Sequence, residues 1–255
     1  MTKLHTPTTL LRAGATTAVT LAAGTAAADV VDVDFTDTDK GRTVRLGFYE
    51  GDTQTSSMKV FAGELEHTFS GGTGLGGLFS GSFTTFCVDV HQSVSRNATE
   101  FDVVSLASVP GPGGMGNARA GAISSLFTVG TSSYGSMDRD FAAAFQLLVW
   151  EIVADYDATV GIASIDLSTG SFRATKGNGS QLWSGVNDDV ETLLSSMGTA
   201  GLDVGNPGVW AFASDTYQDQ LVFAPQIIPS PGSAALAAVG GLCFSVRRRR
   251  ENPRG

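Results

Sequence analysis

Positive charge is scarce in the body of this sequence. Residues 29–230 contain nine Lys and Arg against twenty-four Asp and Glu, a balance of −15. So acidic a surface repels the phosphates of nucleic acids, which excludes DNA and RNA as partners. Gly and Ser are abundant instead, together with Val, Leu, Ile and Phe. This mixture predicts many short strands joined by turns rather than a disordered chain.

The apolar run near the amino terminus is too short to cross a membrane. It covers residues 13–24, follows a basic stretch, and precedes the small residues Ala26 and Ala28. A spanning helix needs about 20 apolar residues, whereas this order of features is typical of a secretory signal peptide. We therefore predict a signal peptide over 1–28 and export of the remaining chain.

Three features follow one another at the carboxy terminus: a Pro-Ser-Pro-Gly motif, an apolar stretch at 234–246 and a basic cluster. The motif is Pro229, Ser230, Pro231 and Gly232, and the cluster is Arg247, Arg248, Arg249 and Arg250. From residue 227 the segment is nearly long enough to span a bilayer, and its arginines would stay in the cytoplasm. This order resembles the PEP-CTERM sorting signal, although the central acid of that motif is missing here. The resemblance implies that 227–255 is a transmembrane sorting tail, which an exosortase cuts to deliver the protein to the cell surface or the extracellular matrix. A plain membrane anchor is the alternative.

Cysteine is nearly absent as well. Cys87 lies in the domain between the two ends, 29–226, and Cys243 lies in the sorting tail. Processing would leave the two sulfur atoms in different compartments or molecules, so we expect no disulfide within the domain. A single thiol in an exported protein indicates a reactive or otherwise committed sulfur.

Hydrophobic periodicity predicts strands towards both ends of the domain and helices between them. Alternating apolar residues predict seven strands, at 30–35, 42–49, 58–69, 83–90, 101–107, 208–213 and 220–224. Helical spacing predicts three helices with caps at Asn117, Asp138 and Asn187, the first ending near Gly130 and the third at Gly198. This order predicts a single α+β domain, a β-sandwich or β-barrel with a helical insertion.

The strand that carries Cys87 alternates strictly in polarity. One face is apolar and the other mostly polar: Phe86, Val88 and Val90 on the first, and Thr85, Cys87, Asp89 and His91 on the second. We therefore expect the side chain of Cys87 to avoid the apolar core face.

The helix predicted after Asp138 has one polar side chain within an apolar stretch. Gln146 is the only polar residue between Phe141 and Trp150, which predicts a helix covered on more than one side. A buried amide without partners costs about 1–3 kcal/mol. Something must therefore satisfy the amide of Gln146 or consume it.

Two motifs stand out in this domain. One is the pair Phe86-Cys87 on a strand, and the other is a helix in which Gln146 is followed four residues later by Trp150. Together they resemble the Cys-Gln thioester domain of bacterial surface adhesins, which commonly has Thr where this chain has Phe145. The resemblance implies that the Cys87 thiolate attacks the Gln146 amide, releases ammonia and forms a thioester, with Phe86, Phe145 and Trp150 keeping water away. It also implies adhesion by covalent attachment to an amine-bearing surface or matrix protein, most simply through a lysine.

Two other readings remain open. Cys87 can be a small half-buried apolar residue while Gln146 bonds a backbone carbonyl, which leaves a non-covalent structural component of an extracellular polymeric matrix. A cysteine hydrolase would need a histidine beside the sulfur. His91 lies about 13 Å along the strand, and only His67, on a neighbouring strand, could approach. We therefore expect that the protein is not an enzyme.

No motif assigns a metal or a cofactor. The spacing of the glycines at 72, 74 and 77 matches the dinucleotide-binding motif, but no helix is predicted to begin there. Glu151, Asp89 and His91 could assist attack by an amine, although no motif gives them that role. Five aspartates crowd the start of the domain, match no calcium loop and predict a solvated acidic edge: Asp29, Asp32, Asp34, Asp37 and Asp39.

Overall fold

The computed structural model describes residues 28–110, 114–130, 133, 137–200 and 208–225. The predicted signal peptide, apart from Ala28, lies outside these ranges. So does the predicted sorting tail, with its motif, its arginine cluster and Cys243. Within the described ranges, no helix combines the length and the apolar character that crossing a membrane requires.

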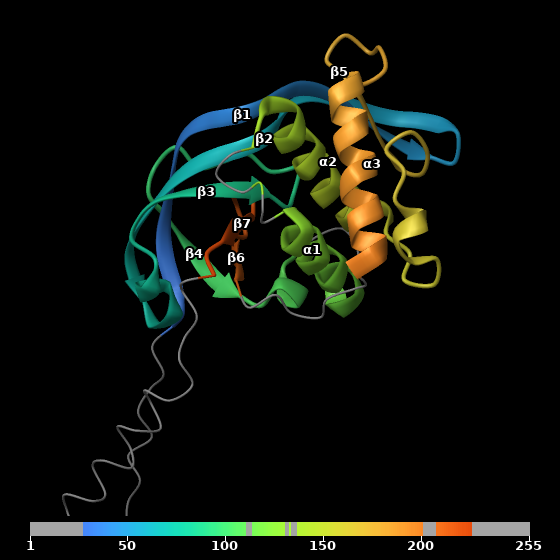
Figure 1. Ribbon diagram of the computed structural model, residues 1–255. Helices are drawn as coiled ribbons and strands as arrows, with labels where there is room; N and C mark the ends of the chain where they lie inside the picture. Colours follow the sequence, from blue (N-terminus) through green and yellow to red (C-terminus); the bar gives the residue numbers. More distant parts are fainter. Residues whose placement is uncertain (1–27, 111–113, 131–132, 134–136, 201–207, 226–255) are drawn as a thin grey trace, which may run out of the picture.

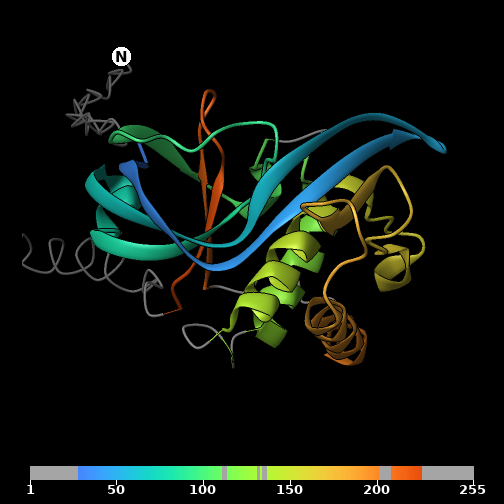
Figure 2. The same ribbon diagram turned by 90° about the horizontal axis from the view of Figure 1, so that it is seen from above.

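A long antiparallel hairpin dominates the fold. Its strands are β1 (Val30–Glu50) and β2 (Thr53–Thr73), and the hairpin curves along its length (Figure 2). Gly41 and Gly63 face each other within it. A Cβ atom on either glycine would overlap the main chain of the opposite strand. The two glycines therefore allow a closer approach of the strands than other residues would.

The sequence predicted two separate strands where β1 is continuous. The segment between them, 36–41, is largely exposed and polar, so it shows no alternation of apolar residues. It still pairs with β2, through register shifts between Phe35 and Asp37 and between Thr38 and Gly41. Main-chain pairing thus continues where the side-chain pattern stops.

Of the seven strands in the described part of the chain, six pair in a closed ring. In addition to the hairpin they are β3 (Gly81–Cys87), β4 (Thr99–Val104), β6 (Val209–Ala213) and β7 (Gln220–Phe223). The order around the ring is β1, β2, β3, β7, β6, β4 and back to β1, and every pair is antiparallel. The seventh strand, β5 (Phe172–Lys176), pairs with the far half of β1 and was not predicted.

Three α-helices lie on one side of the hairpin (Figure 1). They are α1 (Gly116–Gly130), α2 (Arg139–Asp155) and α3 (Ser184–Ala200). Short 3-10 helices occur at η1 (Gly74–Leu78), η2 (Leu106–Ser108) and η3 (Gly161–Ser164). An antiparallel sheet with segregated helices confirms the predicted α+β class.

The helix starts were predicted with mixed success. Asp138 caps α2 as expected, because its carboxylate accepts the N–H groups of Asp140 and Phe141 at 2.8 and 2.9 Å. In contrast, α3 begins at Ser184, before the predicted cap at Asn187, and runs past Gly198. Its early start buries Val186 completely in the core.

Two apolar clusters lie on the two sides of the ring wall. The smaller one fills the ring, since all six strands contribute to it. Its members include Val31, Val33, Phe69, Phe101, Phe212 and Val222, and Phe83 of β3 packs against them. The larger one joins the outer face of the ring and the hairpin to the helices, and it includes Phe86 of β3 and most of α2. β3 is therefore covered on both faces.

Candidate functional site

Cys87 and Gln146 meet in the structure although 59 residues separate them in the sequence. Cys87 ends β3, and Gln146 lies in the middle of α2. Gln146 Oε1 accepts the Cys87 N–H at 2.8 Å, and Gln146 Nε2 donates to the Cys87 carbonyl at 2.8 Å. The pairing of β2 with β3 stops at Thr85. The carboxamide of Gln146 thus satisfies the main chain of Cys87 as a neighbouring strand would.

Both residues are shielded from solvent. Cys87 is 4% exposed and Gln146 is 1% exposed. The predicted surroundings are present: the ring of Phe145 lies 4.6 Å from that of Phe86, between centroids, and Trp150 is buried as well. Phe86 and Cys87 point to opposite faces of β3, as expected. Cys87 is nevertheless buried, and it belongs to the larger apolar cluster.

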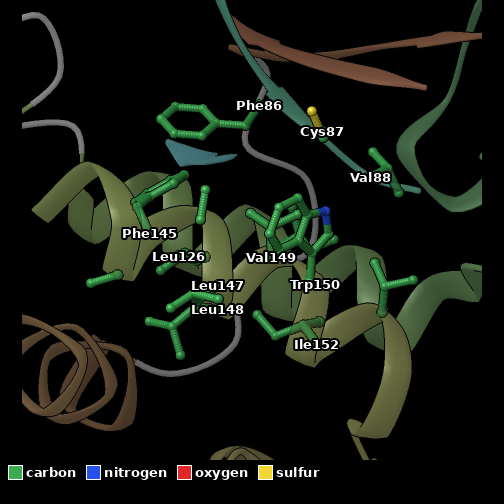
Figure 3. Close-up of a cluster of buried hydrophobic side chains, with 14 of the residues drawn as sticks. Phe86, Cys87, Val88, Leu126, Phe145, Leu147, Leu148, Val149, Trp150 and Ile152 are labelled. Atoms are coloured by element: carbon green, nitrogen blue, oxygen red, sulfur yellow. The ribbon is translucent and has the colours of Figure 1, made fainter. Parts of the chain in front are cut away.

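The sulfur atom points away from the amide of Gln146. Figure 3 shows it on the side of β3 opposite to helix α2, and the thiol donates to Gln218 Oε1 at 2.8 Å. The structure therefore joins Gln146 to the main chain of Cys87 and the sulfur to Gln218. The carbon atom of the Gln146 amide lies beside the Cys87 main chain, so rotation about the Cα–Cβ bond of Cys87 is the movement that would bring the sulfur toward it.

Gln218 belongs to a buried polar chain that runs into one end of the ring. Thr85 Oγ1 donates to Gln220 Oε1 at 2.9 Å, and Gln220 Nε2 donates to the main-chain oxygen of Gln218 at 2.9 Å. His67 Nδ1 contacts Thr85 Oγ1 at 2.8 Å. Since the Thr85 hydroxyl proton is committed to Gln220, we assign the proton of this contact to His67 Nδ1. Burial lowers the pKa of His67 to about 4, so the ring is neutral.

The sequence analysis did not identify this buried network of polar side chains. Gln218 and Gln220 lie 131 and 135 residues from the partners they meet, Cys87 and Thr85. In the sequence they belong to a polar run, 214–220, that leads into the last strand, and such a run is typical of an exposed turn. The one available signal was the polar face of β3, which carries Thr85 and Cys87 side by side.

Burial holds the Cys87 thiol in its neutral form. Desolvation raises the pKa of Cys87 far above its ordinary value, and a hydrogen bond with the Gln220 side chain offsets only part of the shift. A neutral thiol is a poor nucleophile. Formation of a bond from this sulfur therefore requires that its proton be taken up during the attack.

Neither histidine of the described chain is a base for Cys87. His67 bonds Thr85 rather than the sulfur. The strand predicted to reach Val90 ends at Cys87. The predicted separation of Cys87 and His91, which assumed one continuous strand, therefore does not apply. The His91 ring packs against Phe48 instead, with centroids 4.7 Å apart. The described residues thus place no histidine beside the Cys87 sulfur as a cysteine hydrolase requires.

Two acids named in the sequence analysis lie in different surroundings. Asp89 follows β3, is half-buried, and accepts the N–H of His91 at 2.7 Å. Glu151 is buried in α2, where one carboxylate oxygen accepts the N–H of Asp166 at 3.0 Å and the other has no partner. Desolvation raises the pKa of Glu151 to about 8.

Replacement of Glu151 by Gln is expected to stabilise the protein at alkaline pH. The folded protein keeps a proton on Glu151 that the unfolded chain loses near pH 4.5, the ordinary pKa of the group. Stability therefore falls as pH rises through the window between those values, by up to about 5 kcal/mol. Gln stays neutral and still accepts from Asp166. The difference in unfolding free energy between the two proteins, measured by urea unfolding across this window, should increase with pH. A difference that does not change with pH would contradict a raised pKa at Glu151.

The described residues contain no group of three or more His, Cys, Asp or Glu side chains placed to hold a metal ion. Asp37 and Asp39 are exposed along β1, and Asp29 accepts the N–H of Leu75 at 2.7 Å. The glycines at 74 and 77 belong to η1, which follows β2 and precedes β3 in an antiparallel arrangement rather than in a βαβ unit.

Comparison of the chain with protein-family models, with curated proteins and with solved structures gives no match.

Proposed function

We propose that Cys87 and Gln146 form an internal thioester, through which the exported protein attaches covalently to amine groups of a partner on a surface or in a matrix. The observation that carries this proposal is the pair of 2.8 Å hydrogen bonds that fixes the Gln146 carboxamide on Cys87 in a buried site. Fixed, buried reactants gain a large effective concentration relative to free ones.

The geometry supports the first chemical step in one further respect. When the sulfur adds to the Gln146 carbonyl carbon, negative charge develops on Oε1, and the Cys87 N–H already points at that atom. A positioned donor of this kind stabilises the tetrahedral intermediate. The thiol proton passes to the departing nitrogen, ammonia leaves, and the C–S bond remains. To react, the sulfur must first leave Gln218.

The second step is transfer to the partner. An amine nitrogen attacks the same carbonyl carbon, the C–S bond breaks, and Cys87 recovers a thiol while Gln146 carries an amide to the partner. The apolar surroundings of Phe86, Phe145 and Trp150 protect the bond from water until then. The closed ring acts in this proposal as a small β-barrel that supplies Cys87, and the helical insertion supplies Gln146.

Intact mass is the direct test of the thioester. The measured mass of the purified protein should be lower by one ammonia than the mass calculated from its sequence. Treatment with methylamine should add the mass of one methylamine. The Cys87→Ala variant should show neither change. Peptide mapping should place the methylamine on Gln146. Because the sulfur contacts Gln218, Gln218→Ala is the matched control and should still lose ammonia. A measured mass equal to the calculated one, together with ready labelling of Cys87 by a thiol reagent in untreated protein, would contradict the proposal.

One observation favours a second candidate function. In the structure the Cys87 thiol and the Gln146 amide both have hydrogen-bond partners. This satisfied arrangement suits a non-covalent component of an extracellular matrix. For that candidate we expect a measured mass equal to the one calculated from the sequence and no reaction with methylamine.

A further inference from the structure

Gln218 is held by the segment that follows β3. Its Nε2 donates to the main-chain oxygen of Asp89, and its N–H donates to the main-chain oxygen of Ser93 at 3.1 Å. The side chain is buried. These contacts fix the carboxamide with Oε1 toward the sulfur of Cys87, which donates to it at 2.8 Å.

The Cys87 thiol is the one hydrogen-bond donor to Gln218 Oε1 within the part of the chain that the structure describes. A thioester sulfur carries no hydrogen, so closing a bond between Cys87 and Gln146 removes this donor whatever the position of the sulfur. A buried acceptor without a donor raises the free energy of the state that contains it. Opening the thioester restores the thiol and therefore the hydrogen bond.

We infer that Gln218 is a positioning residue that shifts the equilibrium between the closed and the open Cys87–Gln146 site toward the open form. The inference rests on the proposed function and adds a residue that controls how readily the bond is given up. In the opening step with ammonia, the nitrogen bonds the Gln146 carbonyl carbon, the C–S bond breaks, and one proton passes from the nitrogen to the sulfur. The new thiol then donates to Gln218 Oε1. Closure follows the same steps in reverse and releases ammonia.

The size of the effect is set by the cost of a buried acceptor that lacks a donor. This cost corresponds to a change of about 5- to 100-fold in an equilibrium constant. Closure also takes Gln146 Nε2 away from the Cys87 carbonyl, but that loss is the same whatever residue occupies position 218. Substitution at 218 therefore isolates the contribution of the acceptor for the thiol.

The equilibrium is measured with ammonia, which converts the thioester back to the Gln146 amide. Each protein is incubated at a series of ammonia concentrations and one pH until the fraction of molecules lighter by one ammonia, read from the intact mass, is constant. Met is similar in length to Gln but offers the thiol only a weak acceptor. For Gln218→Met, the ammonia concentration at which half of the molecules are open should therefore rise about 5- to 100-fold.

A second variant separates the two hydrogen bonds of the Gln218 side chain. In Gln218→Glu, an ionised Glu still accepts from the thiol but cannot donate to the Asp89 carbonyl, so the half-opening concentration should not rise. Gln92→Met is the control. It makes the same change in the segment after β3, at a side chain that donates to the main-chain oxygen of Asp215 at 3.5 Å, and it should match wild type. Urea unfolding of each variant checks that it is folded.

The outcomes distinguish this inference from the proposed function. No ammonia loss from any of these proteins, at any ammonia concentration, overturns the proposed function and the role of Gln218 with it. Ammonia loss with equal half-opening concentrations for wild type and Gln218→Met overturns the role of Gln218 alone. An equal rise in Gln218→Met and Gln218→Glu also overturns it, because the contact with Asp89 would then be responsible.

Discussion

Replacement of Gln146 by Ala should lower the unfolding free energy by about 3–5 kcal/mol before any covalent bond is considered. The substitution leaves the N–H and the carbonyl of Cys87 buried without partners, since both bond this one side chain. It also opens a cavity in the middle of α2, where every neighbouring side chain is buried. Urea unfolding followed by far-UV circular dichroism measures the change.

Cys87→Ala separates the covalent contribution from this non-covalent one. That variant keeps both hydrogen bonds of Gln146, because they involve only the main chain of Cys87. A thioester between residues 87 and 146 would close a 59-residue interval and stabilise the protein by about 4 kcal/mol, if the loop-entropy treatment of disulfides applies. Cys87→Ala should then lose about that amount in addition to a small packing cost, and wild type opened with methylamine should lose the same.

The pattern of results is diagnostic. With a thioester, both variants are strongly destabilised and methylamine weakens wild type. Without it, Gln146→Ala is destabilised, Cys87→Ala changes by about 1 kcal/mol, and methylamine has no effect. A Gln146→Ala protein within about 1 kcal/mol of wild type would contradict the role given to its two hydrogen bonds.

Replacement of Gly63 by Ala is expected to cost about 3–5 kcal/mol. Gly63 has a φ of +153°, and a Cβ atom there would overlap the carbonyl of Lys40 and approach Gly41 Cα to 2.6 Å. Both obstacles are main-chain atoms, which cannot move without separating β1 from β2. The two strands would have to part where Gly41 and Gly63 face each other.

Gly51 is the matched control for this prediction. It also has a positive φ, +60°, but a Cβ atom there would meet nothing within 4 Å. Gly51→Ala should therefore cost only the conformational strain, about 1 kcal/mol. Thermal and urea unfolding of the two variants under the same conditions compare them. Equal losses would show that the contact between the strands is not what requires glycine at 63.

The predictions that were confirmed concern features encoded by residues close together in the sequence, such as the burial of a helix and its N-terminal cap. The run of apolar residues around Gln146 indicated a helix covered on several sides, and α2 is buried from Ala142 to Val153. Asp138 was recognisable as its cap because a carboxylate satisfies the first N–H groups of a helix. Both features depend on residues close together in the chain.

What the sequence did not predict depends on distant partners. The middle of β1 pairs with β2 through its main chain, while its side chains there are exposed and polar. The approach of Gln218 to Cys87 depends on β7 entering beside β3. The direction of the sulfur is a choice between side-chain rotamers, which no periodicity encodes. The class of the domain and the two candidate residues could thus be named in advance, but their relative geometry could not.

The position of β7 has a consequence for when the site can assemble. Between β3 and β4 the ring is closed by β7 and β6, which come from the last described part of the chain. Until those strands arrive, Cys87 sits on an incomplete wall and lacks Gln218 as a neighbour. A polypeptide emerging amino terminus first would therefore keep its thiol uncommitted until nearly all of the domain had emerged. The shielding from solvent that the proposed thioester needs would accordingly be complete only after β6 and β7 had been synthesised.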